Sequence, residues 1–564
     1  MVEVVRFVHA ALARIVDVAI VVLIAAIGWI AITGGTTYTL WGARVSVRGV
    51  DNPLLLLAMA CVGRYCIRTW SPFLGLRRWS LREVDAVAFT TLTYMGERLS
   101  ALDRTRAVRA VAVIAAVSLL IKAAGAWSSP GFFSGDDVEI HEMSLGLLWN
   151  GAWPIWELRS PVFPLGVIFP FQWGANAVGL QDAQTLVIVG RSVVVVISTF
   201  AVFLTARAFG RTEQGVAVVA ASLLAFNRLQ LSFGSSELPR PVSTVFVLGA
   251  YLCLQGTPSI ARAGIAGTLL GLAASLRFSE ALFLVPALIA LIIRRSFGAA
   301  IVCAFAATAT GAVVVGVSDH LYWKSAFHSL AAITDYTLVK GLSSRGYQSP
   351  LWYVINVAQC TSIPVIALAA FGVSKRTIHP VLWVVCPLVL LSCLPHKEAR
   401  YLIPVIPFIA ILGAHGTVAF IDWSRRRLGQ GRRPRIALCV VAVLLGFLQD
   451  LGHWRLPRTN DDVRFALALR RVVPEGATLV VEQVWRMGGH IYLPRYDLRD
   501  LDPNQLPVPG YLKSMVSVDS WVVLDERSEA PLVSGLTERG FHKVLSTRGS
   551  RLGLWKPSGA SGGQ

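Results

Sequence analysis

The segment from Thr185 to Arg207 reads TLVIVGRSVVVVISTFAVFLTAR and is almost entirely apolar. A helix needs about 20 apolar residues to cross the hydrocarbon core of a bilayer, so this segment is long enough to span one. Similar apolar runs recur along most of the 564-residue chain. Because a backbone inside lipid must satisfy its own hydrogen bonds, these runs predict membrane-spanning helices.

The composition supports the same interpretation. Hydrophobic residues make up 54% of the chain, charged residues only 15%, and the mean hydropathy is +0.60. A soluble domain carries roughly 25% charged residues. These values exclude an ordinary soluble enzyme and a disordered chain. The eight cysteines lie in or beside apolar runs and form no disulfide framework or zinc-binding spacing.

We therefore predict an all-α polytopic membrane protein with about 13 transmembrane helices. The predicted spans lie near 15–32, 53–67, 110–127, 185–207, 213–226, 241–256, 261–277, 280–293, 299–317, 351–373, 379–395, 401–421 and 436–450. Three parts follow from this pattern: an N-terminal two-span extension with a basic linker (1–109), a transmembrane module (110–450) with a first outer loop at 128–183, and a C-terminal tail (451–564).

The positive charge of the chain is explained by its topology. The net charge is +19, and the basic residues concentrate in short loops between the apolar runs. If the linker at 68–109 is cytosolic, alternation of the spans brings the other basic loops to the same side, as the positive-inside rule requires. These loops contain Arg207 and Arg211, Arg294 and Arg295, Lys375 and Arg376, and the stretch 424–435. We therefore expect the protein to bind a lipid bilayer and no nucleic acid.

The C-terminal tail has a different character from the rest of the chain. DDVRFALALRRVV has a helical pattern, whereas ATLVVEQVW, SWVVLDE and HKVLSTRG read as short strands separated by turns. These features predict a small α/β domain on the outer face, with a disordered end.

The first candidate site is the acidic stretch SGDDVEIHE, which opens the first outer loop. Asp136, Asp137, Glu139 and Glu142 place four carboxylates within seven residues. Mutual repulsion in such a cluster raises some pKa values or requires a cation partner. A carboxylate just outside a membrane is suited to deprotonate an incoming hydroxyl group. The alternative is a solvated acidic loop.

Two further stretches combine charged and aromatic residues. Trp156, Glu157 and Arg159 suit a sugar, through stacking on a ring face and hydrogen bonds to hydroxyl groups. The alternative is an interfacial aromatic belt with a local ion pair. The stretch HKEAR, with His396, Lys397, Glu398 and Arg400, lies in a very short loop between two apolar runs, where charges are costly unless used or paired. Its three cationic side chains can hold a phosphate, and the alternative is a charged hinge.

These motifs, in this order, resemble the GT-C mannosyltransferases of glycosyltransferase family 22, which use dolichyl-phosphate mannose. HKEARYLIP resembles the family's His-Lys-Glu-any-Arg-aromatic signature, Asp136-Asp137 its Asp-Glu pair, and Trp156-Glu157 with Arg159-Ser160 its Trp-Glu and Arg-Ser stretch. Leu276-Arg277 resembles its Leu-Arg-Pro-Thr region, and Pro350-Leu-Trp352-Tyr353 its Pro-Trp-Tyr stretch. The resemblance covers about 110–420 and departs at Phe278 and Ser279, which replace Pro and Thr.

The resemblance implies a membrane glycosyltransferase that moves a hexose, mannose in this family, from a polyprenyl-phosphate sugar to a glycan or glycolipid hydroxyl with inversion. Asp136 or Asp137 would act as the base. His396, Lys397 and Arg400 would bind the donor phosphate. Substrate contacts would come from Glu139, Trp156, Glu157, Arg159, Arg277 and Glu398. This chemistry requires no cofactor or metal, although the acidic cluster could bind a divalent cation.

The implied active site faces away from the cytosol, on the periplasmic side of a bacterial inner membrane, or on the lumenal side of the ER membrane in a eukaryote. Two other functions fit the sequence. One is a transporter or flippase of a lipid-linked saccharide, with Arg191 and Arg277 in a central pathway. The other is a GT-C relative with a different acceptor, such as a protein hydroxyl or a lipid A phosphate.

Overall fold

The computed structural model describes residues 36–40, 43–47, 103–151, 153–210, 213–340, 348–356, 360–394, 396–427, 456–501, 515–517, 519–525, 536–538, 540–547 and 549–558. The predicted spans at 15–32, 53–67 and 436–450, and most of the basic linker, lie outside these residues. A short antiparallel hairpin, β1 (Thr36–Leu40) and β2 (Ala43–Val47), is described in the N-terminal extension, where the sequence predicted none.

Long apolar helices form the body of the protein, as predicted. Five of the described helices are long and apolar enough to cross a membrane, namely α4 (Arg104–Trp127), α7 (Ala183–Arg207), α13 (Phe297–Trp323), η5 with α17 (Lys375–Cys393) and α18 (Ile406–Arg427). Shorter apolar helices pack between them: α8 (Gln214–Ala225), α10 (Arg240–Gln255), α11 (Ile260–Leu276), α12 (Leu284–Ile293) and α16 (Ile363–Phe371). The chain is thus an integral membrane protein, and the predicted total of 13 spans is only partly matched.

Local sequence signals set the ends of these helices. The carboxylate of Asp103 accepts a hydrogen bond from the Arg106 amide at the start of α4, and Asp182 does the same for Thr185 at the start of α7. Glycines allow α11 to approach α13 closely, because a Cβ atom at Gly271 would collide with the backbone of α13.

One predicted span is not a continuous helix. Residues 351–373 contain the one-turn helix α15 (Trp352–Ile355) and then α16, which begins only at Ile363. Ser362 occupies the N-cap position of α16, and Pro364 lies in its first turn. Proline is favoured in the first turn of a helix and disrupts a helix interior. A new helix therefore begins just before Pro364, and the helix of residues 352–355 does not continue through it.

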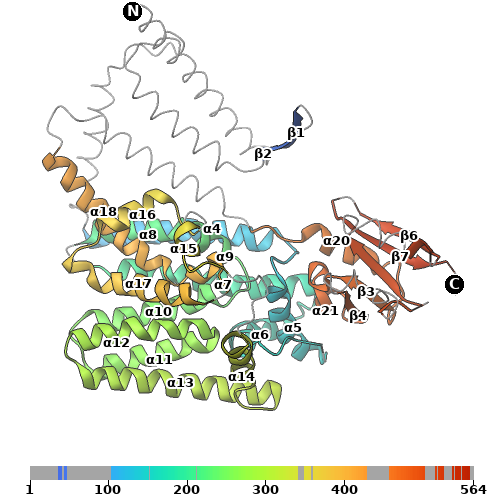
Figure 1. Cartoon of the computed structure of the whole chain (residues 1–564), viewed down its shortest axis with the longest axis horizontal. Helices are drawn as coiled ribbons and strands as arrows, with labels where there is room; N and C mark the ends of the chain where they lie inside the picture. Colours follow the sequence, from blue (N-terminus) through green and yellow to red (C-terminus); the bar gives the residue numbers. More distant parts are fainter. Residues whose placement is uncertain are drawn as a thin grey trace, which may run out of the picture.

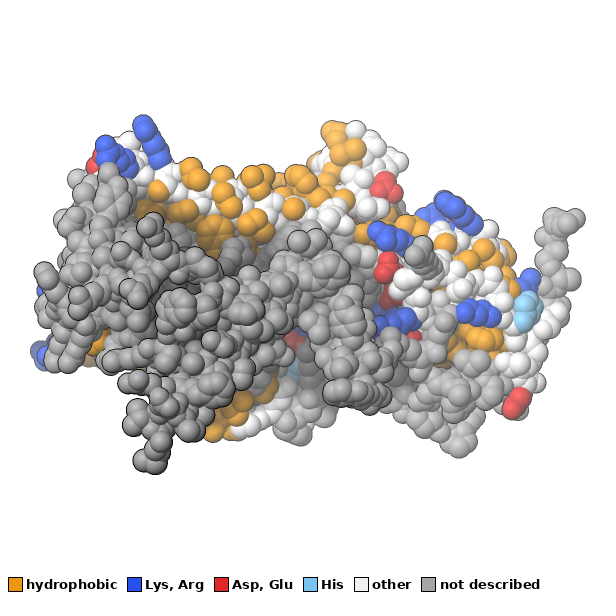
Figure 2. Space-filling model, turned by 90° about the horizontal axis from the view of Figure 1, so that it is seen from above, with side chains coloured by type: hydrophobic (Ala, Val, Ile, Leu, Met, Phe, Trp, Pro, Cys, Tyr) orange, Lys and Arg blue, Asp and Glu red, His pale blue; other side chains and the backbone are white. Residues whose placement is uncertain are grey.

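The first outer loop and the C-terminal domain gather at one end of the helical module, which we call the α5 end (Figure 1). The loop contains α5 (Gly135–Trp149), the π-helical turn η1 (Pro164–Ile168) and α6 (Phe169–Ala177). Other short segments are α9 (Arg228–Phe233), η2 (Phe278–Phe283), α14 (His328–Thr334), η3 (Asp335–Val339) and η6 (Ala399–Leu402). In Figure 2, apolar side chains cover the visible middle of the helices, and charged ones appear toward the ends.

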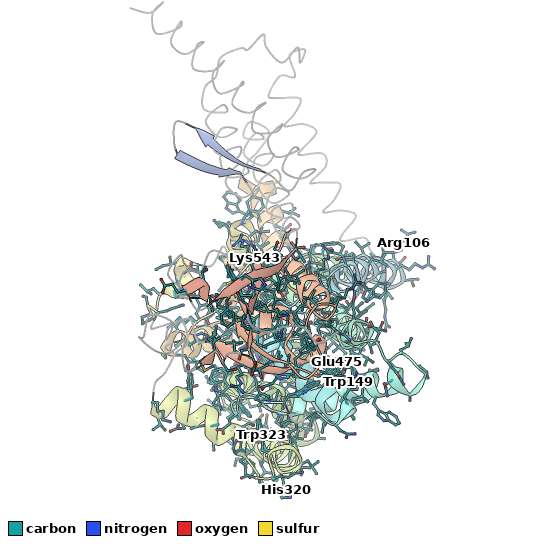
Figure 3. The ribbon with its side chains drawn as sticks, turned by 90° about the vertical axis from the view of Figure 1, so that its right-hand side faces the viewer. Arg106, Trp149, His320, Trp323, Glu475 and Lys543 are labelled. Atoms are coloured by element: carbon teal, nitrogen blue, oxygen red, sulfur yellow. The ribbon has the colours of Figure 1, made fainter. Side chains whose placement is uncertain are left out.

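The C-terminal tail contains the predicted small sheet, with more strands than expected. Its order is β4-β3-β5-β7-β6, in which β3 (Thr478–Glu482) pairs in parallel with β4 (Asp497–Leu501) and β5 (Trp521–Asp525). β7 (Leu552–Pro557) runs antiparallel to β5 and to β6 (Phe541–Ser546). The predicted helix is α20 (Asn460–Leu469), and η7 (Val484–Met487) and α21 (Gly489–Tyr492) follow β3. Seen end-on in Figure 3, this sheet lies in front of the helix ends.

Candidate active site

The N-terminus of α5 separates the two neighbouring aspartates. Asp137 is fully buried, and its carboxylate accepts hydrogen bonds from the amides of Phe133 (3.1 Å) and Ser134 (3.3 Å), which closes the start of the helix. Burial and the nearby charge of Glu237 raise the pKa of Asp137. Asp137 is therefore a structural cap that does not open onto the site.

Asp136 lies at the centre of a cluster of arginines. Its carboxylate forms ion pairs with Arg159 (2.5 Å to Nη2) and with Arg400 (3.0 Å to Nη2), and its side chain remains 22% exposed. Burial alone would raise the pKa of Asp136, but the positive charges of Arg159, Arg400 and Arg277 outweigh burial and hold it well below its usual range. The structure thus joins the first outer loop directly to the HKEAR turn.

Arg159 connects the acidic helix to an aromatic group. Its Nε donates to Glu139, its guanidinium lies 5.2 Å from the centre of the Trp156 ring, and its carbonyl accepts a hydrogen bond from the Trp323 indole (3.3 Å). Trp156 is 43% exposed. Glu157 points outward, with a side chain that is 69% exposed, 4.0 Å from His328. These residues therefore border the cluster on its solvent side.

The residues of the HKEAR turn point in different directions. Arg400 pairs with Glu398 as well as Asp136, and His396 lies 3.7 Å from Glu398. The predicted phosphate ligand Lys397 is buried and donates to the carbonyl groups of Gln348 (3.0 Å) and Leu394. Lys397 therefore ties the turn to the backbone, and its ammonium group does not face Asp136.

The sequence interpretation missed a fourth arginine beside the cluster, Arg240. The Arg240 guanidinium lies 4.0 Å from the centre of the Tyr401 ring, with its Nε 3.8 Å from Glu280. Arg277 has no hydrogen bond or ion pair from its side chain within the described part of the chain, although its charge acts on Asp136. The sequence feature that could have identified Arg240 is its position at the start of an apolar run, where a charge is costly unless it is paired or functional.

An apolar cavity opens next to Arg277. Its volume is about 290 Å³, and it lies between α11, η2, α13 and α14. Ser275, two residues before Arg277, and Phe278, which follows it, line this cavity. Ala307, Val315 and Phe327 form its opposite walls. The carbonyl group of Ser275 also accepts a hydrogen bond from Ser160, next to Arg159 (3.2 Å). Residues close to Arg277 in the chain thus line an apolar pocket, and a hydrogen bond links the same stretch to Ser160, the neighbour of Arg159.

Arg191, which the transporter alternative placed in a pathway, serves as an internal brace. It is fully buried, pairs with Glu237 (2.5 Å), and donates to the carbonyl groups of Ala126, Ser129 and Gly131. All of these partners belong to the helical module, so Arg191 joins α7 to the segment that follows α4. Among the described residues no group of His, Cys, Asp and Glu side chains is arranged to hold a metal ion.

The fold and the sequence both have known counterparts. The structure of ArnT from Cupriavidus metallidurans in the apo state matches with a TM-score of 0.55 and 15% identity, over 80% of this chain and 99% of that one. The same protein bound to undecaprenyl phosphate matches with a TM-score of 0.51 and 14% identity, over the same shares of the two chains. The arabinofuranosyltransferase AftD from Mycobacteria matches with a TM-score of 0.48 and 16% identity, over 81% of this chain and 40% of that one.

The predicted GT-C fold is therefore confirmed at the level of architecture. Among curated proteins, none matches the chain closely enough in sequence to count as a relative. The sequence profile described as the Alg9-like mannosyltransferase family matches residues 152–455, which is more than half of the chain. The protein is a membrane glycosyltransferase of the GT-C type, and it belongs to the Alg9-like mannosyltransferase family.

Proposed function

We propose that the protein transfers a hexose, specifically mannose, from a polyprenyl-phosphate sugar to a hydroxyl group of a glycan or glycolipid, with inversion at the anomeric carbon. The observation that carries this proposal is the place of Asp136. Its partly exposed carboxylate contacts two arginines and is affected by the charge of Arg277, whose chain neighbours Ser275 and Phe278 line an apolar cavity. We infer from these positions that a base, a phosphate site and a site for a lipid chain lie near one another.

The chemistry follows from these positions. Asp136 accepts the proton of the acceptor hydroxyl as its oxygen bonds to the anomeric carbon. The bond between that carbon and the phosphate oxygen breaks, and polyprenyl phosphate leaves with the electron pair. Arg277 and Arg400 stabilise the charge on the leaving phosphate, with His396 at the edge of the turn. The proposed reaction requires no metal.

The sugar contacts come from the residues around this centre. Glu139, Arg159 and Glu398 offer charged groups to sugar hydroxyls, and the exposed ring of Trp156 offers a stacking face. Glu157 lies on the outer side, where an acceptor would enter. The apolar cavity suits the first isoprene units of the donor, and the structure of ArnT with undecaprenyl phosphate supports a lipid of this class.

Donor binding must also release the base. In the free protein, Asp136 is paired with two arginines, which makes its carboxylate a weak base. The donor phosphate competes for Arg400, whose own pKa the carboxylates of Asp136 and Glu398 raise against the effect of burial. When Arg400 turns toward the phosphate, Asp136 loses a cation partner, and its pKa rises toward its ordinary value.

This exchange predicts different pH profiles for the free and the loaded enzyme. The kcat/KM profile reports the free enzyme, where the depressed pKa keeps Asp136 ionised, so its acid limb should fall below the ordinary aspartate value of about 3.9. The kcat profile reports the donor-bound enzyme, and its acid limb should lie at higher pH. Both profiles can be measured with a saturating acceptor. Coincident acid limbs would show that Arg400 keeps its contact with Asp136.

We further infer that the α5 end faces the non-cytosolic side, the periplasm in a bacterium or the ER lumen in a eukaryote. Arg207, Arg262, Arg294 and Lys375 flank helix ends at the opposite end of the module, as a cytosolic face requires (Figure 1). In a cysteine-free background, an impermeant thiol reagent added to intact cells should label Glu157→Cys and leave Arg262→Cys unlabelled. The reverse pattern would place the site in the cytosol.

The function itself is tested by reconstitution with a panel of polyprenyl-phosphate hexoses and mass spectrometry of the products. We expect transfer from the mannose donor and the opposite anomeric configuration in the product. Release of the sugar to a lipid or glycan acceptor distinguishes an enzyme from a flippase, which would move the intact donor across the bilayer. Retention of configuration, or transfer from a nucleotide sugar alone, would contradict the proposal.

A further inference from the structure

The C-terminal domain is docked tightly on the segment that begins the first outer loop. The amide of Thr459 donates to the carbonyl of Phe132 (3.0 Å), and the amide of Phe132 donates back to the Thr459 hydroxyl (3.2 Å). The side-chain oxygen of Asn460 accepts hydrogen bonds from Ser129 (2.6 Å) and from the amide of Gly131 (3.0 Å). The domain therefore holds the chain just before α5.

A second set of contacts reaches α5 itself. The buried carboxylate of Glu142 accepts two hydrogen bonds from His490 at the start of α21, one from the amide (2.8 Å) and one from ring Nδ1 (2.9 Å). The His490 ring stacks on Trp153, with 5.5 Å between ring centres and 14° between ring planes. Trp485 of the same domain packs beside Gly135, the first residue of α5. The domain thus covers one face of the N-terminal half of α5, from Gly135 to Glu142.

The carboxylates of Asp136 and Glu139 lie on a different face of α5 from the one that the domain covers. Gly135, Val138 and Glu142 lie at helical spacing on the face against the domain, where Gly489 approaches Val138 and Glu142. Asp136 and Glu139 lie about 100° around the helix and pair with Arg159. Because both faces are occupied, a loss of contact on the domain face changes where Asp136 lies.

Glu142 also acts on the site electrostatically. Its charge adds to the effect of burial in raising the pKa of Glu139, the other carboxylate bound to Arg159. A Glu142 without its histidine partner would be a buried, poorly paired carboxylate close to the cluster, which is costly. The contact with His490 therefore affects both the position of α5 and the charge around Arg159.

We propose that the C-terminal domain is part of the active site, and that His490, acting through Glu142, is a positioning residue for the base Asp136. This inference rests on the proposed function, because it assigns the reaction to Asp136. The domain acts as a brace that fixes the first turn of α5 against Arg159 and Arg400. Removal of the brace slows the chemical step while leaving the donor phosphate site, which lies on other elements, in place.

The test uses the full-length protein with the variants His490→Ala, His490→Asn and Glu142→Gln. We expect His490→Ala to lower kcat between about tenfold and 100-fold with the donor KM unchanged, because small displacements of a base have effects of this size. His490→Asn should restore most of kcat, since its amide nitrogen can donate where Nδ1 does. His542→Ala is the matched control, because His542 is exposed on the edge strand β6 and its ring hydrogen-bonds Ser558 of the same domain.

Hydrogen–deuterium exchange provides a readout that does not depend on turnover. His490→Ala should increase exchange at the amides of residues 135–139, and His542→Ala should not. If the brace is present but the proposed reaction is wrong, exchange will change although no donor is used. If wild-type activity is found and His490→Ala changes neither kcat nor exchange, the positioning role is wrong. If His490→Ala does not fold, the same measurements are made on Glu142→Gln. If neither variant folds, the contact is needed only for folding and the proposal is overturned.

Discussion

Replacement of Asp136 by asparagine should lower the rate of sugar transfer by about 10²- to 10⁴-fold, the usual contribution of a general base. The amide keeps the size of the carboxylate but cannot accept the acceptor's proton. Because Asp136 is 22% exposed and Arg400 retains Glu398 as a partner, the variant should fold and bind the donor. Single-turnover transfer from a labelled donor, together with donor binding at equilibrium, measures the two effects separately.

The neighbouring residue provides the control for this experiment. Burial, with the charge of Glu237, raises the pKa of Asp137 and favours its neutral form. Its side chain accepts hydrogen bonds from the amides of Phe133 and Ser134. An asparagine can accept the same hydrogen bonds, so Asp137→Asn should keep transfer within about threefold of wild type, a change worth less than 1 kcal/mol. Equal loss in both variants would mean that the start of α5 matters only as a structural unit.

The sequence predicted the helices better than their breaks. An apolar run such as 297–323 determines a membrane helix by itself, because hydropathy and backbone hydrogen bonding are local properties. At the interruption between α15 and α16, a serine precedes the new helix and a proline lies in its first turn, and both residue types also occur inside continuous spans. Strand β4 was missed because its sequence, DLRDL, is charged and acquires its conformation by pairing with β3.

The same limit applies to the candidate site. The motifs indicated which segments carry charge, and the structure places Asp136, Arg159 and Arg400 in contact. Sequence could not separate Asp136 from Asp137, since adjacent residues of a helix point about 100° apart and the direction of each depends on packing. It could not show that Lys397 turns to backbone carbonyl groups, because the Gln348 carbonyl that it binds lies far away in the chain.

Arg277 and Arg400 should differ in how their loss affects the protein, and this difference tests the phosphate site. Arg277 has no ion pair within the described residues, so Arg277→Gln should leave thermal stability unchanged. If it binds the donor phosphate, the variant loses a charge-assisted hydrogen bond worth about 1.5–3 kcal/mol, and kcat/KM for the donor should fall by about 10- to 100-fold. Arg277→Lys keeps the charge and should recover part of this loss.

Arg400→Gln should instead impair both properties. Arg400 is the shared partner of Asp136 and Glu398, and its removal leaves two largely buried carboxylates with fewer cations. Breaking a buried ion pair costs about 3–5 kcal/mol, so the melting temperature should fall along with donor use. Thermal unfolding and donor titrations on both variants give the four values needed. Unchanged donor use in Arg277→Gln, with loss confined to Arg400→Gln, would exclude Arg277 from the phosphate site and assign the phosphate to the HKEAR turn alone.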